Sequence, residues 1–102
     1  MINVSVTYTV RPEFAEQNKL NISRFIRDFQ GLDNSRFAYH VFVKDDGVTF
    51  VHVSSYQDEK MQQQVLSVPS FLEFQAKRDQ SGLNGSHAVS IMDFVDAAKP
   101  IF

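Results

Sequence analysis

Cysteine is absent from this chain of 102 residues. Without it the chain can form no disulfide, thiolate nucleophile, iron–sulfur cluster or cysteine-ligated zinc site. The first residues lack the basic start and long apolar run of a signal peptide, and no run is long enough to cross a bilayer. Basic residues are scattered and the formal net charge is −2, which argues against nucleic acid or an anionic membrane as the main partner. We therefore expect a cytoplasmic protein.

The composition is that of an ordinary globular domain with an unusual share of phenylalanine. Hydrophobic residues make up 43% of the chain and charged residues 22%, and the length suits one domain over residues 1–102. Ten phenylalanines in so short a chain predict an aromatic-rich core.

The strongest structural pattern covers residues 36–56. Two runs rich in β-branched and aromatic residues flank Asp45-Asp46-Gly47, and this combination predicts a β-hairpin. The chain's two internal histidines, His40 and His52, lie one on each strand.

The pairing register of this hairpin decides which face each histidine occupies. A two-residue turn pairs Val41 with His52, whereas a three-residue turn with Gly47 in a bulge pairs His40 with His52. We favour the second register, because Asp-Asp-Gly suits a type I turn followed by a left-handed glycine. It places the following side chains on one face: His40, Phe42, Phe50, His52 and Tyr56.

The rest of the chain alternates between strand and helix patterns. Strict alternation predicts a strand over residues 2–10, and helical spacing predicts a helix from Pro12 to a C-cap at Gly31. A second helix begins near Gln57 and is interrupted at Pro69, which cannot continue a helix bond. Its second piece ends near Gln80. The remaining elements are an exit loop over 81–85, a strand over 86–95 and a tail.

The order strand, helix, strand, strand, helix, strand predicts an α+β fold, a ferredoxin-like βαββαβ sandwich with both helices on one face of an antiparallel sheet. The first and third strands are expected to be central. The opposite sheet face keeps apolar side chains and no cover. We therefore expect a partner on it, most simply a second copy of the chain.

The chain resembles the dimeric α/β-barrel superfamily, in particular its antibiotic-biosynthesis-monooxygenase-type (quinol monooxygenase-like) domains. The similarity covers nearly the whole chain. Its marks are a first strand running into Arg11-Pro12-Glu13, a third strand ending at Tyr56, and a helix broken at residues 67–71. The resemblance implies pairing of two sheets into a dimeric barrel. Members of that superfamily include cofactor-free oxygenases of quinols and aromatic polyketides, haem-degrading enzymes, and many proteins of no known activity.

The residues depart from the haem-degrading branch of that superfamily. Tyr56 stands where that branch has tryptophan, Gln75 where it has the iron-ligating histidine, and Val6 where it has asparagine. Without an iron ligand, haem chemistry has no anchor. We expect no cofactor.

Cofactor-free oxygenation needs an apolar pocket, a base for a phenolic proton and donors that hold the resulting anion. His52 and His40 are the internal side chains with near-neutral pKa. We predict His52 as the catalytic base, with His40 and Tyr56 in support. Side chains that could contact an aromatic substrate are Tyr8, Tyr39, Phe50, Phe71 and Phe74. The competing interpretation is that these residues only fill sheet and core positions.

A metal site is not expected, because two histidines across a hairpin fall short of the three or four ligands that zinc takes, and Asp45 and Asp46 are explained as turn formers. His87 is predicted to be exposed. Two functional classes remain open. One is a monooxygenase acting on a small aromatic or quinol-like molecule, and the other is a non-catalytic dimeric module that binds a small ligand or regulates a partner.

Overall fold

The computed structural model describes the backbone of residues 1–102 and every side chain except those of Ser81 and Ser86. The elements follow the predicted order. In sequence they are β1 (Ile2–Val10), the 3-10 turn η1 (Pro12–Phe14), α1 (Ala15–Phe29), β2 (Phe37–Val43), β3 (Thr49–Tyr56), α2 (Glu59–Leu66), α3 (Pro69–Lys77), the π-helical turn η2 (Arg78–Gly82) and β4 (Leu83–Met92).

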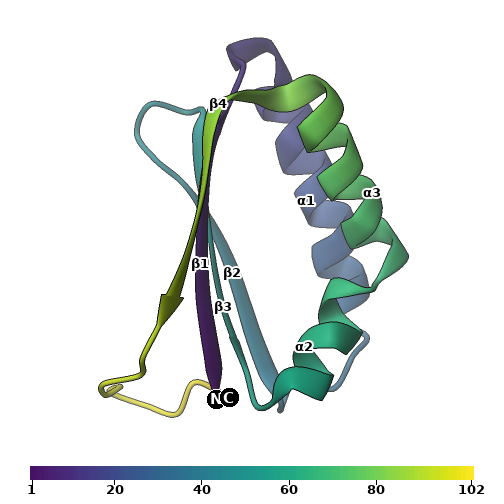
Figure 1. The fold of residues 1–102 in the computed structure, drawn as a ribbon. Coiled ribbons are helices and arrows are strands. Elements are labelled where there is room, and N and C mark those ends of the chain that lie inside the picture. The colour runs from purple at the N-terminus through teal and green to yellow at the C-terminus, as the bar shows by residue number, and fades with distance from the viewer.

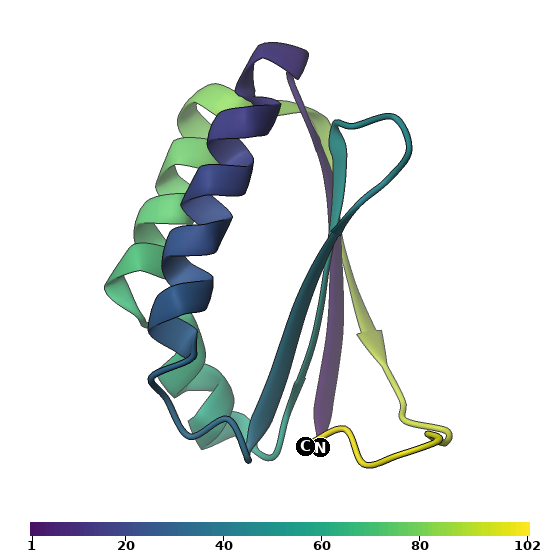
Figure 2. The same cartoon turned by 180° about the vertical axis from the view of Figure 1, so that it is seen from behind.

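The strands form one antiparallel sheet in the order β2-β3-β1-β4, so the first and third strands are central as predicted. The three α-helices lie together on one face of this sheet, and Figures 1 and 2 show the two layers edge-on from opposite sides. The predicted α+β, ferredoxin-like fold is confirmed.

The second helical segment is broken where Pro69 requires it. Asp58 caps α2 by accepting a hydrogen bond from the Met61 backbone N–H, and α2 ends at Leu66. Val68 has an extended conformation, and Pro69 opens α3 as its first residue. The break lets α2 and α3 follow the curvature of the sheet (Figure 1).

The favoured hairpin register is wrong, and the alternative is correct. Val41 pairs with His52, and Val43 pairs with Phe50. Gly47 has a φ of 74° and its N–H donates to the Lys44 carbonyl, so the expected turn with a left-handed glycine does form. However, the Asp46 carboxylate also accepts hydrogen bonds from the backbone N–H groups of Val48 and Thr49. These bonds hold Val48 in the loop, and the strands therefore pair one residue out of the favoured register.

The fourth strand begins earlier than residue 86, because Leu83 already pairs with Val10. The segment read as an exit loop contains two different features. Residues 78–82 form the π-helical turn η2, and Gly85, with a φ of 93°, lies at a register shift within β4. A glycine in the left-handed region is typical of a β-bulge.

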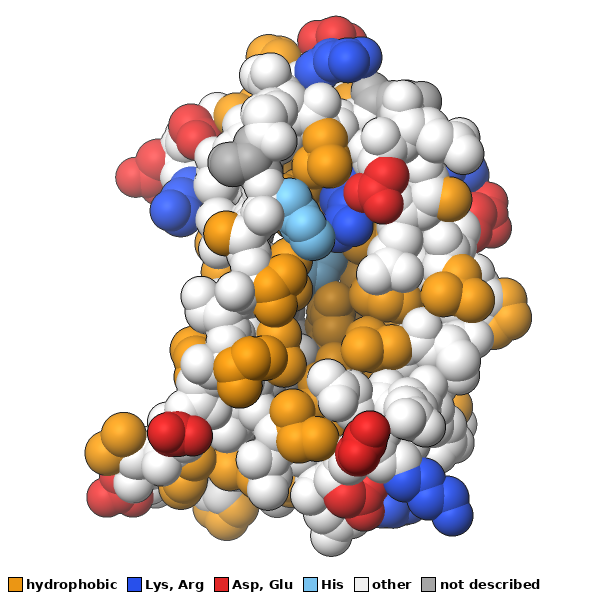
Figure 3. Space-filling model, viewed as in Figure 1, with side chains coloured by type: hydrophobic (Ala, Val, Ile, Leu, Met, Phe, Trp, Pro, Cys, Tyr) orange, Lys and Arg blue, Asp and Glu red, His pale blue; other side chains and the backbone are white. Residues whose placement is uncertain are grey.

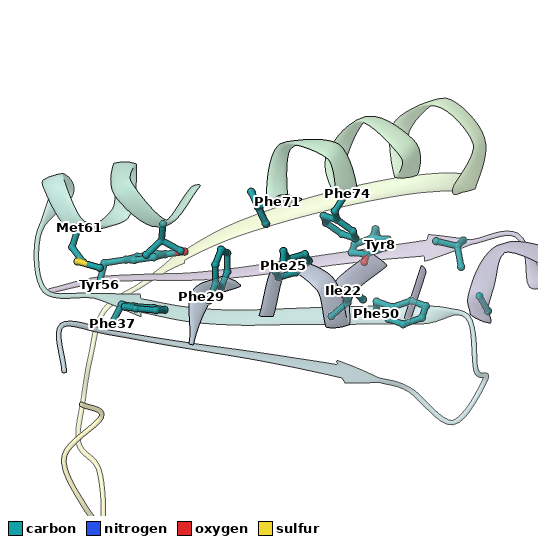
Figure 4. Close-up of a cluster of buried hydrophobic side chains, with 13 residues drawn as sticks. Tyr8, Ile22, Phe25, Phe29, Phe37, Phe50, Tyr56, Met61, Phe71 and Phe74 are labelled. Carbon is teal, nitrogen blue, oxygen red and sulfur yellow. The ribbon is translucent and has the colours of Figure 1, made fainter. Parts of the chain in front are cut away.

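The core lies between the helices and the sheet and is dominated by aromatic rings. Phe25 is fully buried at its centre and contacts Phe29, Phe71 and Phe74 at centroid distances of 4.9–5.1 Å. Figure 4 shows the cluster extending from Tyr56 and Met61 at one end of the sheet to Tyr8 and Phe50 at the other. The predicted phenylalanine-rich core is confirmed.

No helix covers the other sheet face among the described residues. The tail after β4 swings to that side and returns to the N-terminus (Figure 1). Between the tail and the sheet lies a hollow of about 640 Å³, lined by Ala38, His40, Val53, Ser55 and residues 97–101. None of the helices described here is long and apolar enough to span a membrane.

Candidate functional site

A cavity of about 250 Å³ lies between the sheet and the helices α2 and α3. Its walls come from all four strands and both of these helices, and Figure 3 shows it as a cleft with hydrophobic and histidine side chains between β4 and the helices. The lining residues are Val4, Val6, Tyr39, His52, Ser54, Tyr56, Gln62, Leu66, Phe71, Gln75, Val89 and Ile91. None of these lining residues carries a formal charge, so the cavity suits a largely apolar ligand with a few polar groups.

Part of the predicted site lies at this cavity. His52, Tyr39, Tyr56 and Phe71 line it. Phe50 and Phe74 are buried in the core instead. Tyr8 is also buried and reaches the site only through a hydrogen bond to His52.

His40 lies on the opposite face of the sheet. It neighbours Tyr39 in β2, so its side chain points away from the helices, where it is exposed and stacks on Phe42 at a centroid distance of 6.4 Å. The placement of His40 and His52 on one face followed from the wrong register. Their predicted joint role therefore has no shared location in this chain.

His52 is the centre of a buried hydrogen-bond network. Its Nε2 lies 2.8 Å from the Tyr8 hydroxyl, and its Nδ1 lies 2.7 Å from the Tyr39 hydroxyl. The Tyr8 hydroxyl also accepts a hydrogen bond of 2.9 Å from Asn18 Nδ2 on α1. The network thus connects a helix to the cavity wall across three strands, and both ring nitrogens of His52 are in use.

Burial dominates the titration of this network. It lowers the pKa of His52 to about 3, helped by the positive charge of Arg78 and by His87. Burial raises the pKa of Tyr8 to about 12, against the opposing effects of the Asn18 hydrogen bond and Arg78. Burial likewise raises the pKa values of Tyr39 and Tyr56. At pH 7 all four side chains are therefore neutral.

Asn18 and Arg78 belong to the site but were not predicted from the sequence. Asn18 has a visible signal, because it falls at helical spacing on the apolar stripe between Ala15 and Ile22 and is fully buried. Arg78 has none. It comes from η2, is 6% exposed, and places its guanidinium 5.1 Å from the Tyr8 ring centroid and 5.4 Å from that of Phe74. Its Nε bonds the Asp79 carboxylate at 3.0 Å.

Among the described residues, no group of three or more His, Cys, Asp or Glu side chains is arranged to hold a metal ion. Gln75, the position compared with a haem-ligating histidine, does line the cavity. Its amide can donate and accept hydrogen bonds.

Comparison with solved structures agrees with this architecture. A crystal structure of an antibiotic biosynthesis monooxygenase superimposes with a TM-score of 0.78 at 16% identity, over 94% of this chain and 100% of the other. Rv0793 from Mycobacterium tuberculosis gives 0.79 at 18% identity, over 96% and 98% of the two chains. SnoaB, a cofactor-independent oxygenase from Streptomyces nogalater, gives 0.71 at 12% identity, over 97% of each chain.

No family model matches the sequence, and no curated protein does. These three structures are below one fifth identical to this chain, so they establish its fold alone. That fold is the one of antibiotic biosynthesis monooxygenase domains, as the sequence resemblance implied. Oxygenase activity is what the descriptions of two of these neighbours state for those proteins.

Proposed function

We propose that the cavity beneath α2 and α3 binds a small neutral aromatic molecule with a hydroquinone-like oxygen, and that this protein is a cofactor-independent monooxygenase. The observation that carries the proposal is the uncharged cavity itself, with Phe71, Leu66 and Ile91 as apolar walls and Tyr39 and Tyr56 as polar groups. At about 250 Å³ it lies just below the usual volume range of small-molecule sites. This size suits one or two rings.

The reaction that fits such a ligand consumes only dioxygen. A hydroquinone and one dioxygen give a hydroxyquinone and water, and the substrate supplies all the electrons. Loss of the phenolic proton makes the ring electron-rich enough to reduce dioxygen, so the site must favour the anion. Preorganised donors on the wall of an apolar cavity do this effectively. We assign that role to Tyr39 and Tyr56, which line the cavity.

The predicted role of His52 as the base changes under this proposal. A pKa of about 3 makes the ring a weak base at pH 7. We propose that His52 orients Tyr39, to which it is bonded at 2.7 Å, and that the substrate proton leaves to water at the open side of the cleft. His40 has no part in this site.

Dioxygen consumption tests the proposal with a panel of one-ring and two-ring hydroquinones. Leu66→Trp fills the cavity and is expected to lower turnover by about tenfold or more, because misplacement of a substrate costs at least that much. Leu72→Trp is the matched control, since Leu72 lies on α3 at 49% exposure and does not line the cavity. Equal rates in both folded variants would place the reaction elsewhere, and no hydroquinone-dependent uptake would contradict an oxygenase.

The weak basicity of His52 favours a second candidate, a non-catalytic module that binds a small aromatic ligand. Its distinguishing result is saturable binding of a hydroquinone or quinone, blocked by Leu66→Trp, without dioxygen consumption.

We further propose that two copies pair through the helix-free sheet face. Val51 and Val53 are half-buried there, Phe42 is 58% exposed, and the tail leaves a hollow above the sheet. A stable interface buries about 800 Å² per subunit. Sedimentation is expected to show a dimer at micromolar concentration, and a monomer there would contradict this proposal.

A further inference from the structure

We propose that Asn18 sets the direction of the hydrogen bonds that run through Tyr8 and His52 to Tyr39. Tyr39 consequently presents a donor to the cavity, so the cavity selects ligands that place an acceptor oxygen, a carbonyl or a phenolate, against it. Asn18 is a positioning residue, since it touches no ligand. The inference rests on the cavity being the ligand site proposed above.

The direction starts at the Asn18 amide. Its Nδ2 donates to the Tyr8 hydroxyl oxygen at 2.9 Å, and its Oδ1 is buried without a partner among the described residues. Turning the amide over would bury an unpaired NH₂ group in place of an unpaired carbonyl oxygen. Buried orphan N–H groups are the rarer and costlier of the two. Asn18 is therefore the donor.

Each later bond follows from the one before. Because the Tyr8 oxygen accepts from Asn18, its own hydrogen goes to its other partner, His52 Nε2, at 2.8 Å. A neutral imidazole has one N–H, which must then be on Nδ1, and Nδ1 donates to the Tyr39 oxygen at 2.7 Å. Tyr39 has no other hydrogen-bond partner in the described part of the chain. Its hydroxyl hydrogen is left for the cavity that it lines.

The direction requires that His52 stay neutral, since an imidazolium would donate to both tyrosines. The surroundings keep it so. The titratable or charged groups that act on His52 and Tyr39 are Tyr8 on β1, Tyr56 on β3, Arg78 in η2 and His87 on β4. The helices contribute uncharged side chains: Asn18 and Phe25 from α1, Gln62 and Leu66 from α2, and Phe71, Phe74 and Gln75 from α3.

The tautomer of His52 tests the direction without any ligand. The ¹⁵N chemical shifts of an imidazole report which nitrogen carries the proton. Wild-type protein at pH 8 is expected to show His52 protonated on Nδ1, with His40 and His87 as internal references. Protonation on Nε2 overturns the proposal, and this holds even if no variant folds.

Asn18→Asp is expected to reverse the whole chain at that pH. A carboxylate only accepts, so Tyr8 would donate to Asp, His52 Nε2 to Tyr8, and Tyr39 to Nδ1. The His52 proton should then move to Nε2. The matched control is Asn21→Asp, since Asn21 is 3% exposed on the same helix and is bonded to Gln17 instead. It should leave the tautomer unchanged, whereas an unchanged tautomer in Asn18→Asp contradicts the assigned role.

4-Nitrophenol, whose absorption reports its ionisation, tests the consequence for ligands. Wild type and Asn21→Asp are expected to bind the phenolate about tenfold more tightly than the phenol, the effect of one hydrogen bond to a charged oxygen. Asn18→Asp is expected to prefer the phenol. Preference for the phenol in wild type overturns the ligand selection. If wild type has the Nδ1 tautomer but binds no nitrophenol, the proposed ligand site and the selection fail, while the hydrogen-bond direction stands.

Discussion

Histidine has opposite environments on the two faces of the sheet. His52 on the helix-covered face is 3% exposed, is bonded to two tyrosines and is held neutral by burial. His40, on the neighbouring strand, points to the helix-free face, where it is exposed and stacks on Phe42. The difference comes from one residue of register, because successive side chains of a strand point to opposite faces.

This contrast shows what the helices add to the sheet. Under α1 and α3, phenylalanine rings enclose His52 and its tyrosine partners, and the polar groups bond to one another because water is excluded. On the other face, β1 presents Ser5, Thr7 and Thr9 at partly exposed positions, while Asn3 is buried and bonded to Ser55 and the Met92 carbonyl. The covered face therefore combines a cavity with a buried network in which two tyrosine hydroxyls bond one histidine.

The largest expected difference between the two faces is the loss of stability when a phenylalanine is replaced by alanine. Phe25→Ala removes the ring at the centre of the core and should lower the free energy of unfolding by about 3–5 kcal/mol. Phe42→Ala on the helix-free face should change it by about 0.5 kcal/mol or less in the monomer. Urea denaturation at several protein concentrations measures both. If both variants lost the same free energy of unfolding at every protein concentration, the two faces would contribute equally to stability and the comparison would fail.

The second largest effect is expected in the pH dependence of the free energy of unfolding, to which the buried His52 contributes and the exposed His40 does not. The unfolded chain protonates His52 near its ordinary pKa of 6.5, whereas the folded protein does so only near 3. Between these values the unfolded state binds the extra proton, so acid favours unfolding, and above pH 6.5 the effect vanishes. From pH 7 to pH 5 this should cost about 2 kcal/mol.

Denaturation of His52→Gln and His40→Gln at both pH values isolates this effect, because the exposed carboxylates titrate alike in the two variants. The loss between pH 7 and pH 5 should disappear in His52→Gln and persist in His40→Gln. Persistence in both would show that His52 is not buried as a neutral ring.

The smallest expected effect is at the loop that sets the register. Asp46→Ala removes the carboxylate that bonds Val48, Thr49 N–H and the Thr49 hydroxyl, and should cost about 1 kcal/mol because the site is exposed. Asp45→Ala, which leaves the Asp46 bonds in place, is the control. Nuclear Overhauser contacts between Val41 and His52 should weaken in the first variant only. Intact contacts at full stability would mean that packing alone holds the register.

The elements and their order were predictable because each depends on short-range pattern. Alternation over Ile2–Val10 and the interruption at Pro69 gave the correct strand and the correct helix break. Where prediction failed, a side-chain hydrogen bond or an unusual backbone conformation changed the strand pairing. The Asp46 carboxylate lengthened the hairpin loop, and β4 began at Leu83 because Gly85 forms a bulge within the strand.

The residues of the candidate site could be predicted only where they lie on the predicted strands and helices. His52, Tyr39, Tyr56 and Phe71 line the cavity, but the residues that organise it come from elsewhere in the chain. Asn18 reaches Tyr8 from α1, and Arg78 covers Tyr8 from η2. Phe50 and Phe74 were expected to contact a substrate and are instead packed within the core.

The sequence by itself determined the βαββαβ order, the phenylalanine core and the helix break, since propensity, periodicity and proline stereochemistry act within a few residues. Only the tertiary structure decided which histidine is buried, which tyrosines bond it and that burial keeps it neutral. Those outcomes depend on pairing register and on desolvation by distant elements, and neither is written in any local stretch of the chain.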